Sequence, residues 1–318
     1  MLTYIGRKSF RLVGVVIAVS ILTFLIVSLL PGDVVYAIAG QDATPEDIEK
    51  IRQELGLNDP FILRYFKWAI AALAGDFGHS IRTWEPVMDA ILSRLPVTVE
   101  LLVLAQILAT VCAVPVGVYS AYRAGTASDK GITIFAFGLI SVPNFVFALI
   151  LIYVFAIQLG VLPATGFVPL SESVGRNLAA MVLPVLAIAL GEWVGLMRVL
   201  RSDMIGVLQE DYIAMARAKG LPNWHILFKH ALRPSSFTLI TILGLQIGAL
   251  IGGALIVETI FALPGLGRLL VENIYARDYM MIQGCILFIS VGYVVINFIV
   301  DLLYGVLDPR IRVEGAHG

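Results

Sequence analysis

The sequence contains little charge for its length. Only 14% of its 318 residues are charged, against about a quarter in an average soluble domain. By contrast, 59% are hydrophobic, and the mean hydropathy is +0.91. The net charge of −1 provides no basic excess for binding nucleic acid. These values exclude a soluble globular domain and indicate an integral membrane protein.

The residues that usually mark an enzyme are also scarce. Cys112 and Cys285 both lie in apolar runs, so we expect buried thiols rather than a disulfide or a metal cluster. No Gly-x-x-x-x-Gly-Lys-Ser/Thr phosphate loop, His-Glu-x-x-His pair or nucleophile elbow is present. We therefore expect no enzyme chemistry and no cofactor bound by this chain.

Six apolar runs reach the roughly 20 residues that a helix needs to cross a bilayer. They cover 12–30, 97–119, 132–159, 178–200, 237–261 and 280–303. As a straight helix the third run would measure about 42 Å, which exceeds the ~30 Å hydrocarbon core. Pro143-Asn144 near its middle predicts a kink, and Pro115 and Pro184 could bend the second and fourth runs.

Lysine and arginine indicate the orientation of these runs. With the N-terminus inside, the cytoplasmic segments hold thirteen Lys and Arg residues, whereas the two short outer loops hold three. We therefore expect both termini in the cytoplasm. Arg198 and Arg201, at the inner end of the fourth run, are expected to extend to the cytoplasmic surface.

The segment after the first run, 32–96, is acidic and is expected outside the cytoplasm. Capping and turn signals predict three short helices, which start near Thr44, Asp59 and Pro86. Gly56 is expected to end the first of them. The segment is interpreted as a small cap on the membrane surface, an interpretation compatible with docking of an external soluble partner.

A polar segment between the fourth and fifth runs has the pattern of an amphipathic helix over about 203–220. Its apolar residues recur at helical intervals: Ile205, Leu208, Tyr212 and Met215. Gly220 is expected to end it. The orientation places this helix in the cytoplasm, where it either anchors a loop at the interface or offers a surface to a partner.

The same segment resembles the cytoplasmic signature of the permeases of binding-protein-dependent ABC importers. That signature is Glu-Ala-Ala, three residues and Gly, followed nine residues later by an apolar-x-Leu-Pro ending. Here Ala214-Met215-Ala216 precede three residues and Gly220, and Pro234 comes one place late. Ala214 stands where glutamate is expected, and Met215 replaces the first alanine.

The order Asp-Tyr-Ile-x-x-Ala-Arg-Ala-Lys-Gly-Leu from Asp211 is similar to the dipeptide/oligopeptide/nickel group of permeases, in particular its B-type subunit. Supporting motifs follow in order along nearly the whole chain: Leu30-Pro31-Gly32-Asp33, Gly75-Asp76-Phe77-Gly78-His79-Ser80, Arg94-Leu95-Pro96-Val97-Thr98, Val257-Glu258-Thr259-Ile260-Phe261, Pro264-Gly265-Leu266-Gly267 and Asp308-Pro309-Arg310-Ile311-Arg312.

This resemblance implies an all-α integral membrane protein with the six transmembrane helices of a type I ABC importer permease. A small extracytoplasmic helical insertion would follow the first helix. The expected organisation is a tail and first span over 1–31, the insertion over 32–96, a permease core over 97–307 and a cytoplasmic tail over 308–318.

The implied function is that of a pore subunit of an ATP-driven importer in the bacterial cytoplasmic (inner) membrane, carrying di- or oligopeptides inward by alternating access. The same importer type for nickel or another small solute is the alternative. The implied partners, besides membrane lipid, are a homologous second permease, an extracytoplasmic substrate-binding protein and two ATPase subunits, which would bind the ATP and Mg²⁺. ATPase-coupling residues would be Asp211, Tyr212, Ala214, Met215, Ala216, Arg217, Ala218, Lys219 and Gly220.

Few polar residues lie within the spans. Glu192 is the only acidic residue near the centre of one, where a carboxylate costs about 2.5–3.5 kcal/mol on insertion scales. It either lines the translocation path or makes a structural hydrogen bond, and Gln246 and Asn144 are further path candidates. An ion-coupled carrier with Glu192 as its proton-responsive group, or a membrane scaffold, would be functions of other classes.

Three glycines of the fifth run are spaced by four residues: Gly244, Gly248 and Gly252. This spacing predicts a smooth groove that allows close packing of another helix. The packing partner could be a helix of the same chain or one of the paired permease.

Overall fold

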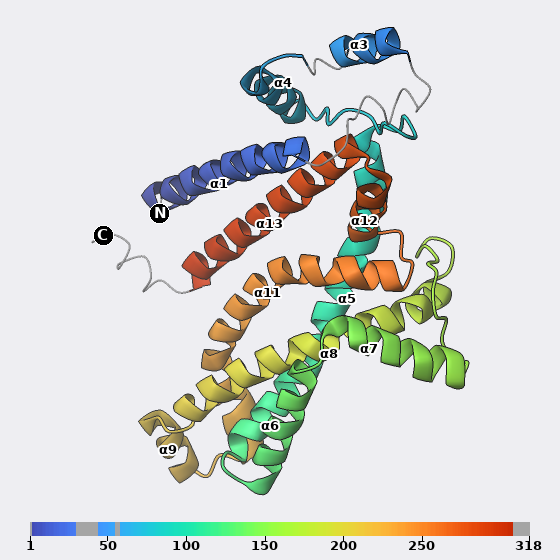
Figure 1. Ribbon diagram of the computed structural model, residues 1–318. Helices are drawn as coiled ribbons and strands as arrows, with labels where there is room; N and C mark the ends of the chain where they lie inside the picture. The colour runs from blue at the N-terminus through green and yellow to red at the C-terminus, as the bar shows by residue number, and fades with distance from the viewer. Residues whose placement is uncertain (1, 30–43, 55–57, 308–318) are drawn as a thin grey trace. The chain divides into compact units, whose positions relative to one another are not determined.

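The computed structural model describes residues 2–29, 44–54 and 58–307, and its regular elements are all helices (Figure 1). These residues form two compact units. The first unit comprises Val99–Leu263 and the end of α13 from Ile299, and the second comprises Leu2–Thr98 and Pro264–Phe298.

The first unit holds the middle of the chain. Its elements are α5 (Val87–Tyr122, which begins in the second unit), α6 (Ala127–Ile140), α7 (Asn144–Leu151), the π-helix η1 (Ile152–Gln158), α8 (Val174–Val207), α9 (Asp211–Ala218), α10 (Asn223–His225), the π-helix η2 (Ile226–Ala231) and α11 (Leu232–Ile260).

The second unit combines the start of the chain with most of its last part. It consists of α1 (Leu2–Leu29), α3 (Pro45–Glu54), α4 (Phe61–Leu73), α12 (Leu266–Ala276) and most of α13 (Tyr279–Leu307). The motifs around Pro31 and Pro309, and Gly56, lie outside the described residues.

Each of the six predicted spans corresponds to helical structure. Four helices are long and apolar enough to cross a membrane unbroken, namely α1, α5, α8 and α13. The other two spans are bent pairs: α6 with α7 and η1, bent by 93°, and the stretch from α10 through α11, bent by 51°. The all-α membrane fold with up to six spans is therefore confirmed.

The bend between α6 and α7 lies where the sequence predicts a kink. α6 ends at Ile140, and Pro143 is the extended residue that caps α7, with φ −61° and ψ 145°. Proline cannot donate a backbone hydrogen bond and disfavours helix at the residue before it. The outcome is a full break at 141–143 rather than a bent but continuous helix.

The separate short helix predicted over 86–95 is wrong. Val87 begins α5, which runs without interruption to Tyr122. Leu95, where the short helix was expected to end, lies in the third turn of α5. Proline is tolerated where the surrounding packing holds the helix together, and Val87, Ile91 and Val97 are all buried.

The predicted extracytoplasmic segment is attached to its own unit by specific contacts. On α4, the Tyr65 hydroxyl lies 2.8 Å from Ser20 Oγ of α1. Phe24 of α1 meets the rings of Phe61, Tyr65 and Trp68. Further along, Ser80 Oγ donates to the buried carboxylate of Asp278 at 2.5 Å. The segment is thus packed against the helices that flank it in the fold.

α8 is the central helix of the first unit and its most buried long helix. It packs against α6, α7 and α11 (Figure 1). At Gly117 of α5 a methyl group would lie 3.2 Å from both the Met197 carbonyl oxygen and the Leu200 side chain. Glycine there lets α5 approach α8 backbone to backbone.

Candidate functional site

The predicted single helix over 203–220 is in fact two helices. α8 continues to Val207, a turn follows at 208–210, and α9 begins at Asp211. Glu210 is extended, with φ −69° and ψ 148°, and caps α9 without a side-chain hydrogen bond. The apolar spacing across this region therefore joins residues of two separate helices.

The break also changes which residues of α9 are buried. Ile213 and Ala216 face inward and pack with Ile226. Tyr212 and Met215 are 45% and 58% exposed. The single apolar face predicted for Ile205, Leu208, Tyr212 and Met215 is wrong, because the turn at 208–210 resets the helical phase.

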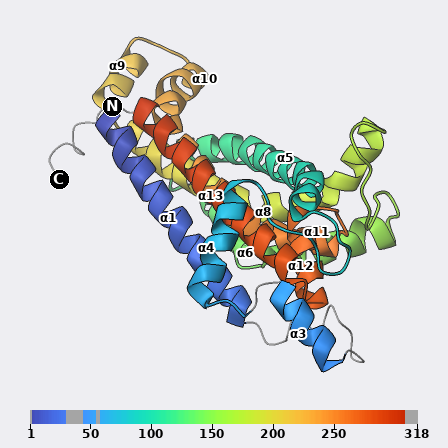
Figure 2. The ribbon, with the colours of Figure 1, turned by 90° about the horizontal axis from the view of Figure 1, so that it is seen from above.

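Gly220 ends α9 in a defined way. Its φ is +76°, a conformation that strains any residue with a Cβ. The Gly220 N–H donates to the Arg217 carbonyl at 2.9 Å, and the Leu221 N–H donates to the Ala216 carbonyl at 3.3 Å. This is the Schellman pattern, with Leu221 packed back on the α9 cluster. Gly220 therefore terminates the helix and turns the chain toward α10 (Figure 2).

The outward side of α9 is unoccupied by the rest of the described chain. Its exposed residues are Asp211, Tyr212, Ala214, Met215, Arg217, Ala218 and Lys219. Beside Arg217 lies a pocket of about 620 Å³, whose lining also includes Arg123 from the turn after α5. Neither arginine forms an ion pair within the described residues. This surface is small, partly apolar and positively charged.

Two side chains bridge α9 and its neighbours. The Tyr212 hydroxyl donates a long hydrogen bond of 3.5 Å to the His230 carbonyl of η2. Partial burial, with the Glu210 carboxylate nearby, raises the pKa of Tyr212, so its hydroxyl stays a proton donor. The Asn223 amide donates to the Tyr122 hydroxyl at 3.1 Å. The first bond joins α9 to η2, and the second joins α10 to the end of α5.

An ion pair that sequence reasoning missed lies near this surface. Arg201 Nε donates to Asp129 Oδ1 at 2.8 Å, and Arg201 Nη2 donates to Asp129 Oδ2 at 2.7 Å. Arg201 therefore does not extend freely to the cytoplasmic surface as expected, because a buried carboxylate of α6 holds it. Arg198 is exposed, with its guanidinium 4.9 Å from the centre of the Phe137 ring.

The polar residues expected on the translocation path come from three helices of the first unit. A methyl group on Gly191 of α8 would lie 2.5 Å from Asn144 Oδ1 at the start of α7. One on Gly195 would lie 3.1 Å from Gln246 Nε2 of α11. Asn144 Nδ2 also lies 3.7 Å from the corresponding position on Gly253 of α11. Asn144 and Gln246 thus face the same glycine strip of α8.

Glu192 follows Gly191 on α8 and is half-buried. No hydrogen bond or ion pair of its carboxylate is found among the described residues. The Gln246 Oε1 atom is buried and likewise has no partner within the described residues. This part of the unit therefore contains polar atoms without a partner among the described residues.

The three glycines of α11 have different surroundings. A methyl group on Gly244 would overlap the Val300 side chain of α13, so α11 and α13 meet closely there. Gly248 is buried, whereas Gly252 is exposed and has nothing within 4 Å of an added Cβ. Close packing within the chain accounts for Gly244 but not for Gly252.

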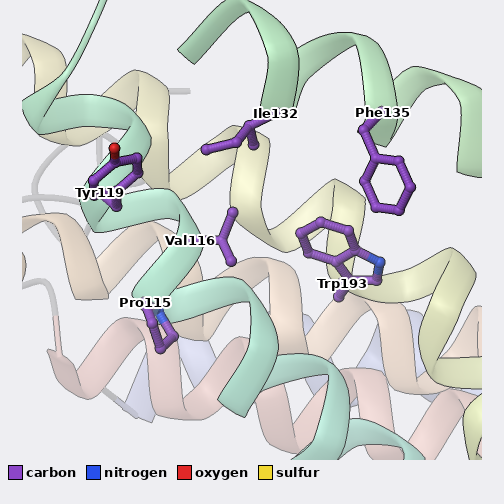
Figure 3. A pocket seen from close by; sticks show the side chains of 6 residues that line it. All are labelled: Pro115, Val116, Tyr119, Ile132, Phe135 and Trp193. Carbon is purple, nitrogen blue, oxygen red and sulfur yellow. The ribbon is translucent and has the colours of Figure 1, made fainter. Parts of the chain in front are cut away.

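A second hollow in the first unit is apolar. Pro115, Val116 and Tyr119 of α5, Ile132 and Phe135 of α6 and Trp193 of α8 line about 350 Å³ (Figure 3). The Tyr119 hydroxyl and the Trp193 indole nitrogen are the only polar side-chain atoms among these six residues. Such walls suit hydrocarbon and do not suit a polar solute.

Comparison with known protein families gives matches along almost the whole chain. Residues 113–313 match the family described as "Binding-protein-dependent transport system inner membrane component", and residues 1–102 match the N-terminal region of such components.

Three relatives are similar over nearly their whole length. A Brucella abortus protein whose name describes a peptide transport system permease is 40% identical, covering 99% of this chain and 100% of the relative. The oligopeptide transport system permease protein AppB of Bacillus subtilis is 40% identical, with coverage of 98% and 100%. The glutathione transport system permease protein GsiC of Escherichia coli is 36% identical, with coverage of 98% and 99%.

Proposed function

This chain belongs to the family of binding-protein-dependent transport system inner membrane components, and we propose that it lines one half of the pore of an ATP-driven importer for di- or oligopeptides. The observation that carries this proposal is the similarity over almost the whole chain to relatives named for peptide, oligopeptide and glutathione transport. Glutathione is itself a tripeptide, so all three names describe peptide-like solutes.

The energy source is proposed to be a pair of separate ATPase subunits that hold the ATP and Mg²⁺. α9 is the docking element for one of them. Its outward side combines Met215 and Tyr212, which can enter an apolar groove, with Arg217 and Lys219, which can meet an acidic rim. Related permeases have a glutamate at the position of Ala214, which carries no charge here. α9 would therefore rely on its shape and on Arg217 and Lys219.

The solute path is proposed to pass the polar strip formed by Asn144, Gln246 and Glu192. A peptide carries an ammonium group, amides and a carboxylate, and this strip offers amide groups and one carboxylate. The glycines at 191 and 195 let the side-chain amides of Asn144 and Gln246 lie close against α8. The second half of the pore would come from a homologous permease, and an extracytoplasmic binding protein would deliver the solute.

The orientation follows from the distribution of Lys and Arg. We place both termini and α9 in the cytoplasm, in the cytoplasmic (inner) membrane of a bacterium. Closure of the ATPases on ATP would displace α9, change the tilt of the attached spans and open the pore outward, and hydrolysis would reset it.

The test is reconstitution in proteoliposomes with and without the ATPases, the second permease and the binding protein. Peptide uptake should require ATP together with this chain, the second permease, the ATPases and the binding protein. Arg217→Glu should lower retention of the ATPase on the purified complex by about tenfold, because it places like charge against an acidic rim. Uptake that persists without the ATPases and follows a proton gradient would instead identify an ion-coupled carrier.

A further inference from the structure

The connection between α9 and α8 is narrow. Only the turn at 208–210 links α9 to α8 along the chain. Arg201 lies six residues before the end of α8 at Val207, about 9 Å along the helix. Whatever holds Arg201 therefore governs the route from α9 through α8, while a second route runs through η2 to α11.

Arg201 pairs with Asp129, which also binds the end of α5 and the turn of the α5–α6 hairpin. Asp129, in the first turn of α6, accepts from Arg201 with both carboxylate oxygens. It also accepts from Ser120 Oγ in the last turn of α5. The N–H of Gly125, in the turn between the two helices, donates to Asp129 Oδ2 at 2.9 Å. One carboxylate thus connects three successive parts of the hairpin to α8.

The connection has little freedom to slip. Asp129 is 2% exposed, and its four donors leave each carboxylate oxygen with two hydrogen bonds. Bidentate pairing with arginine fixes orientation as well as distance. Leu200 and Met204, on either side of Arg201, are fully buried in the apolar cluster that includes Val118 and Ala121 of α5. The Asp129–Arg201 ion pair holds the end of α8 to the α5–α6 hairpin, and this apolar cluster holds the ends of α5 and α8 together.

The part of the hairpin that the Asp129–Arg201 ion pair holds ends where α6 ends. α6 stops at Ile140, and the break at 141–143 allows the 93° bend to α7 and η1. A break of this kind can absorb a change of angle with little cost, whereas the hairpin itself cannot. Movement of the end of α8 would reach α6 directly and change its angle to α7.

We propose that Asp129 and Arg201 are positioning residues that form the mechanical joint between the ATPase-docking helix and the α5–α6 hairpin. When α9 is displaced, the end of α8, the end of α5 and the whole of α6 move as one body, and the break at 141–143 is the hinge. This inference rests on the proposed docking of an ATPase on α9, and it adds how the displacement is distributed to the spans.

The first test compares transport with ATP consumption in the reconstituted complex. Arg201→Met and Asp129→Asn should each lower the peptide transported per ATP hydrolysed by about tenfold, a size usual for coupling between sites. Arg201→Lys should lower it less, because lysine keeps the charge but loses the bidentate geometry. Basal ATP hydrolysis of the assembled complexes should stay close to that of the unchanged complex.

The matched control is Arg198→Met. It removes an arginine from the neighbouring turn of α8, where the guanidinium lies over Phe137 and outside the joint. It should leave transport per ATP unchanged. The double variant Asp129→Asn with Arg201→Met avoids an unpaired buried charge and should assemble even if a single variant does not. The proposed joint is wrong if the double variant fails to assemble, or if it assembles and transports the normal amount of peptide per ATP hydrolysed.

The second test measures the hinge itself. Spin labels at Lys130 of α6 and Ile157 of η1, both exposed, lie on either side of the break. Their distance distribution should change on ATP binding in the unchanged complex and should not change in Arg201→Met. An ATP-dependent change of equal size in both would show that the hairpin moves without the joint.

These outcomes separate the joint from the docking proposal. If Arg217→Glu and other α9 variants leave ATP-driven uptake intact, docking on α9 is wrong. If α9 variants uncouple the complex while Arg201→Met does not, docking stands and only the joint is wrong.

Discussion

Buried polar groups occur at two levels of the first unit, and they are satisfied very differently. Near α9, the Asp129 carboxylate accepts from four donors. Within the spans, atoms of Glu100, Gln106 and Gln246 are buried without a hydrogen-bond partner among the described residues. A buried polar group left without a partner costs about 1–3 kcal/mol. The first level therefore holds one geometry, whereas the second contains polar atoms without a partner among the described residues.

This contrast fits the division of work in a permease. In the proposed importer, the level beside α9 would pass on displacement, which needs saturated bonds and close packing such as that at Gly117. The proposed solute path would bind and release the peptide, which needs polar atoms that the protein does not already occupy. The first three predictions below each have a matched control variant.

The largest effect is expected from Ala216→Arg. Ala216 is 7% exposed and packs with Ile213 and Ile226, so an arginine there either buries an unpaired charge, at about 3–5 kcal/mol, or displaces α9. Substrate-stimulated ATP hydrolysis should be lost while the chain still inserts in the membrane. Gly206→Arg adds the same charge at an exposed position of α8 outside the docking surface and should retain most of the activity; an equal loss in both would show that packing of α9 is not what matters.

A nearly equal loss is expected from Gly220→Trp. Trp at φ +76° is strained, and the Schellman end of α9 would open. Substrate-stimulated ATP hydrolysis should fall as it does in Ala216→Arg. Gly206→Trp, at an exposed glycine of α8 with nothing within 4 Å, provides the size-matched control. Unchanged hydrolysis in Gly220→Trp would mean that this helix end does not position the docking surface.

Gly191→Ala should disturb the fold less than the two α9 variants above, but it should clearly lower transport. The added methyl group would meet Asn144 Oδ1, which can rotate away and leave the polar strip. Peptide uptake should fall with assembly unchanged. Gly206→Ala, in the same helix, should stabilise it by about 0.5–1 kcal/mol and leave uptake intact. Unfolding of Gly191→Ala would show that Asn144 is fixed in place.

Local signals along the chain predict much of this architecture. Runs of apolar residues predict the six spans, Pro143 the break after α6, and Gly220 the end of α9. They succeed because each depends on residues within a few positions of one another. The break at 208–210 has no such signal, since Leu208-Gln209-Glu210 contains neither proline nor glycine and the apolar spacing continues across it.

The joint could not be predicted for a different reason. Asp129 and Arg201 are 72 residues apart, and both lie at ends of apolar runs, where a charge is ordinarily solvated. Only the packing of α6 on α8 brings them together. Similarly, Asn144 and Gln246 are candidates from residue type alone, and their common position beside Gly191 and Gly195 depends on the crossing of three helices.

Within the polar strip, Glu192→Gln and Gln246→Leu should alter transport more than assembly. Gln246→Leu removes a buried oxygen that has no partner among the described residues, so stability should be unchanged or slightly higher. Glu192→Gln removes a charge whose insertion costs about 2.5–3.5 kcal/mol. Initial uptake rates against peptide concentration measure the effect. Loss of the complex on a sizing column in either variant would assign that residue a structural role instead.

The smallest effect is expected from Arg176→Ala, which removes an ion pair with Glu172 at the start of α8. The two side chains are 65% and 57% exposed, so water already solvates both charges. An exposed pair of this kind contributes less than about 1 kcal/mol. Both stability and transport per ATP should stay within error of the unchanged protein. Arg176 and Arg201 lie on the same helix and each pairs with one carboxylate, so a similar loss from both would show that burial of Asp129 is not the source of the difference.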